Sequence, residues 1–217
     1  MSLLTALKIP TKFVRLKKHF GNKAFTLLDI GSGNKSATDF KTYFPNGTYH
    51  GVDMVKDYNY TEEDFGKMEA FYEMDLTKLD LDAIPDNHFD AILMAHIIEH
   101  LHNGDKVLEK LAPKLKSGGV MYIEYPGEKS TTLPSRKGTL NFYDDDTHVR
   151  VYSVSEVTKV LEDVGIKVKA GGLRRSYRNI FMMPIKFIHN RIKYGYIMAS
   201  VFWDWYGFAE YVWAEKE

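Results

Sequence analysis

The sequence predicts an α/β fold built around a largely parallel sheet, and three observations support this prediction. Mostly apolar runs without polar alternation recur along the chain, for example at 27–30 and 89–95. Such runs are typical of strands that are buried on both faces. Helix-like segments separate the early runs, and the first run leads into a glycine-rich bend at 31–34.

Size and composition narrow the classes of protein to consider. The 217 residues can form one large core, and 29 basic against 29 acidic residues leave no net charge to attract a polyanion, so no nucleic-acid partner is expected. The absence of cysteine excludes disulfides, thiolate metal sites and cysteine nucleophiles. No run reaches the ~18 apolar residues of a membrane span, and basic residues interrupt the apolar N-terminus, so we expect a cytoplasmic protein.

Residues 1–24 predict a helical cap on a domain that extends over 25–217. Pro10 interrupts the helical pattern, so two short helices are expected. The cap either packs as a structural element or forms a flap that helps to close a ligand site. Its apolar face would consist of Leu3, Leu4, Leu7, Phe13, Leu16 and Phe20.

The segment after the first strand has the pattern of a nucleotide-type site. Gly31 and Gly33 allow the backbone to turn sharply and to approach a ligand closely. After a helical segment from Lys35 to Phe44, the second strand (48–53) ends in Asp53, 22 positions after Gly31. In a βαβ unit, an acid at this place can accept hydrogen bonds from both ribose hydroxyls.

The elements that follow continue the alternation of helix and strand. Thr61, with Asp64 three residues on, predicts a capping box at a helix start, and a third strand (70–74) ends at Asp75. A fourth strand covers 89–95. The apolar spacing then predicts a helix over 105–116, which residues 117–119 (SGG) would end.

The last third of the chain completes a count of seven strands. A fifth strand covers 120–125, and Ser153 with Glu156 predicts a second capping box for a helix that reaches Asp163. The sixth strand, at 166–170, alternates as if half-exposed. The seventh strand covers 209–214.

Several of these features, in this order, resemble the class I S-adenosylmethionine-dependent methyltransferases, most of all those that act on small molecules. The resemblance covers about residues 25–170. It implies a Rossmann-like, doubly wound, seven-stranded sheet with helices on both faces and its last strand antiparallel. The features that carry it are residues 27–33, Asp53, Asp75 with Leu76, residues 89–92 with 96–101, residues 115–119 and residues 148–152.

The resemblance also implies a site for S-adenosylmethionine, with S-adenosylhomocysteine as the product. Residues 29–33 would contact the amino-acid end of this cofactor, and Asp53 would bind its ribose. The adenine would lie beside Met54, Asp75 and Leu76, and the methionine portion beside Ala95 and His96. The implied cofactor-binding residues are thus Asp29, Gly31, Ser32, Gly33, Asp53, Met54, Asp75, Leu76, Ala95 and His96.

Other nucleotide and metal sites fit the sequence less well. A nicotinamide or flavin fingerprint needs a third glycine where Ser36 stands, and no Gly-Lys-Ser/Thr of a P-loop occurs. Residues 96–100 match the H-x-x-E-H pattern of some zinc peptidases. That pattern directly follows a buried strand, where the methyltransferases commonly have histidine and glutamate. No third ligand is evident, so no metal is expected.

Methyl transfer is an in-line displacement, so holding the acceptor behind the methyl carbon can supply most of the acceleration. A base is needed only for an acceptor that is still protonated, and histidine is the side chain best suited to that task. Candidate catalytic residues are therefore His148, His96 and His100. His148 is the first choice on the acceptor side, because it follows an acidic run in a long loop.

Residues 173–207 separate the last two strands and are rich in aromatic and basic side chains. We interpret them as a lid over a small-molecule acceptor with an apolar or aromatic body, as a homodimer interface, or as a peripheral membrane-surface element. The sequence does not choose between these. A second class of function also stays open, a non-catalytic S-adenosylmethionine-binding module that acts through this segment.

Overall fold

The structure is a computed structural model that describes residues 9–55 and 59–217. Its centre is a seven-stranded sheet in the order β3-β2-β1-β4-β5-β7-β6. The first five strands run parallel, and β7 is antiparallel to both of its neighbours, which confirms the predicted topology. The strands are β1 (Thr26–Ile30), β2 (Thr48–Asp53), β3 (Ala70–Glu73), β4 (Phe89–Ala95), β5 (Leu115–Pro126), β6 (Ile166–Leu173) and β7 (Ala209–Lys216).

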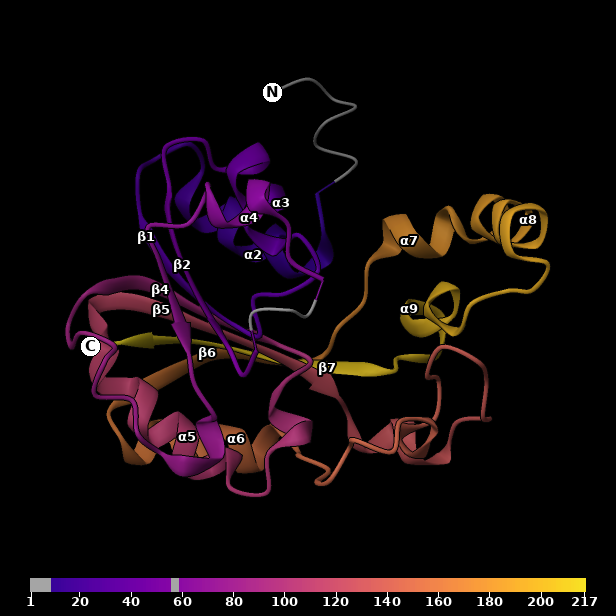
Figure 1. Ribbon diagram of the computed structural model, residues 1–217. Helices are drawn as coiled ribbons and strands as arrows, with labels where there is room; N and C mark the ends of the chain where they lie inside the picture. Colours follow the sequence, from indigo (N-terminus) through magenta and orange to yellow (C-terminus); the bar gives the residue numbers. More distant parts are fainter. Residues whose placement is uncertain (1–8, 56–58) are drawn as a thin grey trace.

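Helices cover both faces of this sheet (Figure 1). One face carries α2 (Thr11–Phe20), α3 (Ser36–Tyr43) and α4 (Glu62–Phe65), and the other carries α5 (Gly104–Leu111) and α6 (Val154–Asp163). Neighbouring residues of β1 point to opposite faces, so Leu27 packs into one buried cluster and Leu28 into the other. This two-sided burial explains why the strand is apolar without alternation.

The N-terminal part of the chain packs on the sheet through α2. Phe13 and Leu16 are fully buried, and the Phe13 ring meets that of Phe40 edge-on at 6.1 Å between centroids. Pro10 immediately precedes the helix, in agreement with the expected start of the second cap helix. The expected first helix, with Leu3, Leu4 and Leu7, lies outside the described residues.

The helix predicted over 105–116 ends earlier, at Leu111, so this prediction was wrong. Pro113 has no N–H to donate to the carbonyl four residues before it, and its ring would clash with that carbonyl. The chain therefore passes through a 3₁₀ turn, Ala112–Lys114, into β5. The residues expected to end the helix lie inside β5, where Gly118 has φ 75° beside a shift in register against β4.

The two predicted capping boxes differ in the structure. At Thr61 both halves form, since the Thr61 hydroxyl accepts from Asp64 N at 3.3 Å and Thr61 N donates to Asp64 Oδ2 at 3.0 Å. At Ser153 the hydroxyl accepts from Glu156 N at 3.2 Å. The Glu156 carboxylate does not reach back, because it pairs with Arg150.

The segment between β6 and β7 forms α7 (Tyr177–Phe181), α8 (Met183–Tyr194) and α9 (Trp203–Tyr206). These helices stand beyond one end of the sheet, apart from the two helical layers (Figure 1). Among the described residues, no helix has both the length and the apolar character needed to cross a membrane.

We expect Tyr152→Phe to lower the free energy of unfolding by about 1–3 kcal/mol, the cost of leaving buried polar groups without partners. The Tyr152 hydroxyl is buried, accepts from Gly104 N at 3.0 Å and donates to Leu101 O at 2.7 Å. Urea unfolding measures the change. Tyr143→Phe is the control, because Tyr143 is 69% exposed, and equal effects of the two substitutions would contradict the prediction.

Candidate active site

A cavity of about 810 Å³ opens at the carboxyl ends of β1, β2 and β4. The strand order reverses at β1, whose neighbours β2 and β4 lie on opposite sides, and ligands of α/β proteins bind at such points. The volume is in the range of small-molecule and cofactor sites. The predicted residues that line the cavity are Gly31, Gly33, Asp53, Met54, Ala95, His96 and His100.

The other predicted residues do not line this cavity. Asp29 and Ser32 are buried beneath it, with 1% and 0% exposure. Asp75 lines a neighbouring depression that shares Met54 with the cavity, and the Leu76 side chain lies in the core. His148 packs behind the cavity wall, where its ring meets that of His100 at 4.9 Å between centroids.

The glycine bend is held by the neighbouring strand. Gly31 N and Ser32 N both donate to the carbonyl of Val52, at 2.8 and 3.1 Å. Gly31 has φ 75°, and a Cβ there would lie 2.1 Å from Ile97 Cδ1, so a side chain is excluded twice over. Asn34 and Lys35 follow in the left-handed region, where the resembling family often has a further glycine.

Below the bend, Asp29 collects hydrogen bonds from three elements. Its Oδ2 accepts from Tyr49 Oη at 2.7 Å and from the Ser36 hydroxyl, and Lys12 Nζ lies 3.4 Å away. Its Oδ1 has no hydrogen-bond partner among the described residues. Lys12 reaches the cavity from α2, a contact that no local sequence pattern indicates.

Asp53 is oriented at the end of β2 by two donors. Oδ1 accepts from Met54 N at 2.8 Å and Oδ2 from Tyr60 Oη at 2.9 Å. Tyr60 also lies 2.7 Å from the Ser32 hydroxyl, so it joins the glycine bend to Asp53. Burial raises the pKa of Tyr60, which keeps its hydroxyl protonated as a donor.

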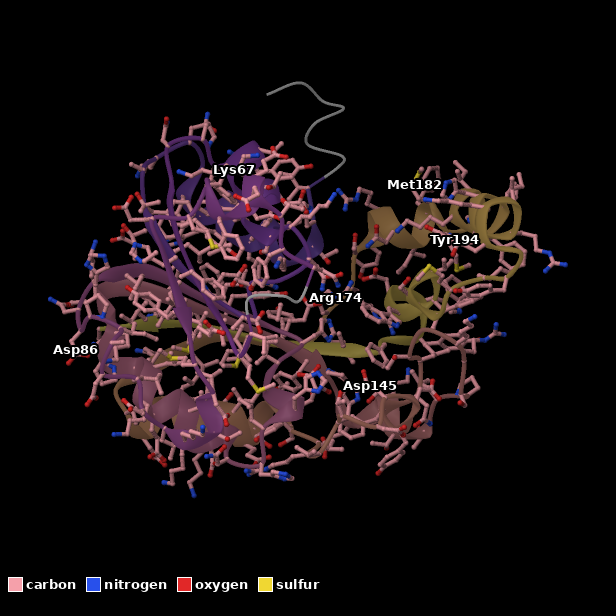
Figure 2. All side chains as sticks on the ribbon, in the orientation of Figure 1. Lys67, Asp86, Asp145, Arg174, Met182 and Tyr194 are labelled. Atoms are coloured by element: carbon pink, nitrogen blue, oxygen red, sulfur yellow. The ribbon has the colours of Figure 1, made fainter. Side chains whose placement is uncertain are left out.

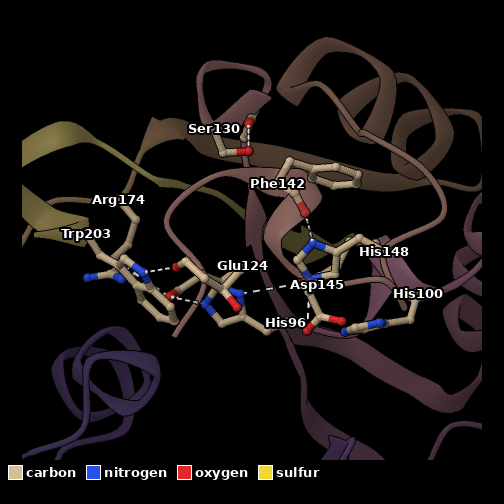
Figure 3. A network of polar contacts seen from close by, with 12 residues as sticks. His96, His100, Glu124, Ser130, Phe142, Asp145, His148, Arg174 and Trp203 are labelled. Atoms are coloured by element: carbon tan, nitrogen blue, oxygen red, sulfur yellow. Dashed lines mark hydrogen bonds and ion pairs between the residues drawn. The ribbon is translucent and has the colours of Figure 1, made fainter. Parts of the chain in front are cut away.

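His96 follows β4 directly and occupies the left-handed region, with φ 58°. Its N–H donates to Glu124 O at 2.7 Å, and its ring lies between two carboxylates, Nε2 at 3.3 Å from Glu124 Oε1 and Nδ1 at 3.3 Å from Glu99 Oε1 (Figure 3). Burial opposes the charged form, but these two carboxylates outweigh it and raise the pKa of His96 to about 9. The cavity wall therefore carries an imidazolium at neutral pH.

Glu124 belongs to a buried network around Arg174 (Figure 3), and Figure 2 shows Arg174 between the sheet and the helices α7 to α9. Arg174 Nε donates to Glu124 Oε1 at 3.0 Å, and its Nη1 donates to Asp204 Oδ1 at 2.5 Å. Burial would raise the pKa of Glu124, but the hydrogen bond from His96 and the charge of Arg174 lower it to about 2. Asp204 also accepts from Asn179 Nδ2 at 2.8 Å, so the network ties α7 and α9 to β5.

The structure brings His100 and His148 together, as Figure 3 shows. The carbonyl of Glu99 accepts from Val149 N at 2.9 Å, which docks the loop of His148 onto the turn after β4. His148 Nδ1 lies 2.7 Å from Phe142 O, and His100 Nδ1 lies 3.0 Å from Thr147 O. Because a carbonyl only accepts, both Nδ1 atoms carry a hydrogen, and neither Nε2 atom takes part in these two bonds.

The doubly wound sheet and the cavity at its switch point define a nucleotide-type ligand site in an α/β protein. The family model described as a methyltransferase domain matches residues 7–170. The chain therefore belongs to this methyltransferase family, and its cofactor is S-adenosylmethionine.

One curated relative matches the chain at low sequence identity. An uncharacterised protein of Methanocaldococcus jannaschii is 26% identical over 164 residues, which are 70% of this chain. The matched part is 43% of that relative's length, so the chain spans less than half of it.

Solved structures support the fold. A SAM-dependent methyltransferase from Archaeoglobus fulgidus superposes with a TM-score of 0.61 at 20% identity, over 95% of this chain and 92% of the other. A phosphoethanolamine N-methyltransferase from Haemonchus contortus, in complex with S-adenosyl-L-methionine, superposes with a TM-score of 0.67 at 15% identity. The match covers 99% of this chain and 53% of the other.

We expect Arg174→Met to lower the free energy of unfolding by about 3–5 kcal/mol, because two buried carboxylates would lose their shared cation. Arg174 is 8% exposed, and the neighbouring Arg175 is exposed, so Arg175→Met is the matched control. Denaturant unfolding at neutral pH measures both variants. A loss below about 1 kcal/mol, which is the range of surface pairs, would contradict the role of this network.

Proposed function

We propose that this chain transfers the methyl group of S-adenosylmethionine to a small-molecule acceptor. The observation that carries the proposal is a cavity that is lined both by the glycine bend with Asp53 and by His96, His100 and Trp203. When bound, the cofactor supplies a methyl group on a positively charged sulfur. The residues of the chain bind and orient the two reactants.

The cofactor would be held at the carboxyl ends of the strands. We assign the ribose hydroxyls to Asp53, the adenine to Met54, Asp75 and the backbone of Leu76, and the methionine portion to Ala95 and His96. The residues Asp29, Gly31, Ser32 and Gly33 would contact its amino-acid end. The carboxylates suit the cationic parts of this ligand, and Asp29 offers a buried oxygen that no described residue hydrogen-bonds. Lys12 adds a cation suited to the carboxylate of the same end.

The acceptor would lie against the segment 173–207. The interpretation of this segment as a lid is supported by its part in the cavity wall. Ser200, Trp203 and Asp204 of this segment line the cavity. The Trp203 indole is fixed, because its Nε1 donates to Thr139 O at 2.7 Å. An indole wall favours an acceptor with an apolar or aromatic body.

The outward face of α8 is the part of 173–207 that would form a homodimer interface or a membrane-surface contact. Ile185, Ile188 and Ile192 are 57%, 61% and 81% exposed and recur at helical spacing, with basic residues beside them. A homodimer contact and a membrane-surface contact both stay predictions for this face. The division into a cap at 1–24, a domain at 25–217 and the insertion at 173–207, and the cytoplasmic location, also stay predictions.

Among the candidate catalytic histidines, geometry separates His96 from the other two. Both ring nitrogens of His96 already face carboxylates, so we assign it a positioning role beside the cofactor. His100 lines the cavity and His148 packs behind it, and each ring bonds a backbone carbonyl through Nδ1. Membership of a methyltransferase family gives the alternative of a non-catalytic module no support.

Calorimetric titration with S-adenosylhomocysteine tests the cofactor half of the proposal. We expect micromolar binding of this ligand and none of NADH. Asp53→Ala should weaken binding about tenfold or more, because it removes hydrogen bonds to a charged group worth about 1.5–3 kcal/mol each, and 1.4 kcal/mol is a factor of ten.

The control for this titration is Asp82→Ala, which removes an exposed carboxylate that does not line the cavity. The affinity of this variant for S-adenosylhomocysteine should equal that of the unmodified chain. Absence of binding to protein that circular dichroism shows to be folded would overturn the proposed function.

A further inference from the structure

Glu99, between His96 and His100, has a carboxylate that is buried. Its side chain is 1% exposed, and neither oxygen has a hydrogen-bond partner within 9–55 and 59–217. His96 Nδ1 lies 3.3 Å from Oε1 as an ion pair, but Oε2 has no such neighbour. A buried carboxylate in this state is costly, and a bound cation is one of the few ways to offset the cost.

The two histidines beside it have the orientation of metal ligands. One ligand atom from each of Glu99, His100 and His148 lies within 4.8 Å of the others. Both imidazoles donate Nδ1–H to a backbone carbonyl and keep Nε2 free. Such an outer hydrogen bond fixes the ring and the tautomer of most histidines that bind metals.

We propose that Glu99, His100 and His148 form a binding site for a divalent transition-metal ion. Two imidazoles and one carboxylate suit zinc, iron, cobalt or manganese better than magnesium or calcium, which prefer oxygen ligands alone. Three protein ligands leave coordination positions open. Asp145 Oδ2, 3.8 Å from His148 Nε2, faces the same ring from the exposed side.

The sequence pattern pointed to a different pair of ligands. The H-x-x-E-H match suggested His96 with His100, without a third ligand, and led us to expect no metal. The structure turns the His96 ring between Glu99 and Glu124 and supplies His148 from a loop 48 residues away from His100. The backbone hydrogen bonds between Glu99 O and residues 149–150 make this meeting possible.

The role of the site rests on the proposed function. His100 and Thr147 line the cavity, so an open coordination position would face the acceptor. A hydroxyl bound there loses its proton to solvent more readily, because a metal lowers the pKa of a coordinated oxygen. That oxygen then forms the bond to the methyl carbon, and the electron pair of the broken C–S bond goes to sulfur. The acceptor class is therefore a hydroxylated small molecule, and no protein base is required.

Metal titration of the full chain, after chelator treatment and dialysis, tests this proposal. We expect one Zn²⁺ or Co²⁺ per chain by calorimetry, a visible absorption band with Co²⁺, and much weaker binding of Mg²⁺. Glu99→Gln and His148→Ala should each weaken Zn²⁺ binding by about tenfold or more. His102→Ala is the matched control, because it removes an exposed histidine two residues from His100.

Absence of binding to the unmodified chain, or equal affinity in the control and in both ligand variants, would overturn the site. His100→Ala, at a partly exposed position, replaces Glu99→Gln if the buried substitution prevents folding. S-adenosylhomocysteine titration of the same samples separates the two proposals. Cofactor binding without metal binding would overturn only the metal site, and metal binding without cofactor binding would overturn only the proposed function.

Discussion

The buried guanidinium of Arg174 is the interaction on which the geometry of the cavity depends. It lies between Glu124 on β5 and Asp204 in the helical segment, at 3.0 and 2.5 Å. The charges of Arg174, Glu124 and Asp204 can be buried only because each one is paired. Removing one partner would leave an uncompensated buried charge, at a cost of several kcal/mol in folding free energy. The network therefore fixes the helical segment relative to the sheet more specifically than apolar packing would.

The same network determines the conformation of His96. A non-glycine residue with φ 58° is strained, and such strain persists where the surrounding structure holds it. Here the backbone N–H of His96 bonds to Glu124 O at 2.7 Å and its ring faces the carboxylate of the same residue. Glu124 is itself held by Arg174, so the cation that positions the helical segment also positions the ring at the cavity wall.

The glycine bend and Asp53, which line the cavity, could be predicted from the sequence because their signals are local. Gly31, Gly33 and Asp53 follow strand ends, and strand ends of a parallel sheet meet at one edge. Lys12 and Asp204 reach the cavity through contacts between distant elements, and no local pattern marks them. The end of α5 was mispredicted for a different reason. The prediction placed the helix end at Gly118 and Gly119, but Pro113 ends the helix before them.

The H-x-x-E-H match at residues 96–100 shows why a motif alone is a poor guide to chemistry. His96 and His100 have the spacing of two ligands on one helical face, but β4 continues to Ala95 and only a 3₁₀ turn, Ile98–His100, follows. His96 lies before that turn and His100 ends it, and each histidine contacts other partners. His96 becomes part of the carboxylate network, and His100 meets His148 across a loop that Glu99 docks through its own backbone. Glu99 thus joins the two sets of residues, because its carboxylate lies between the fixed imidazolium and the pair of free imidazoles.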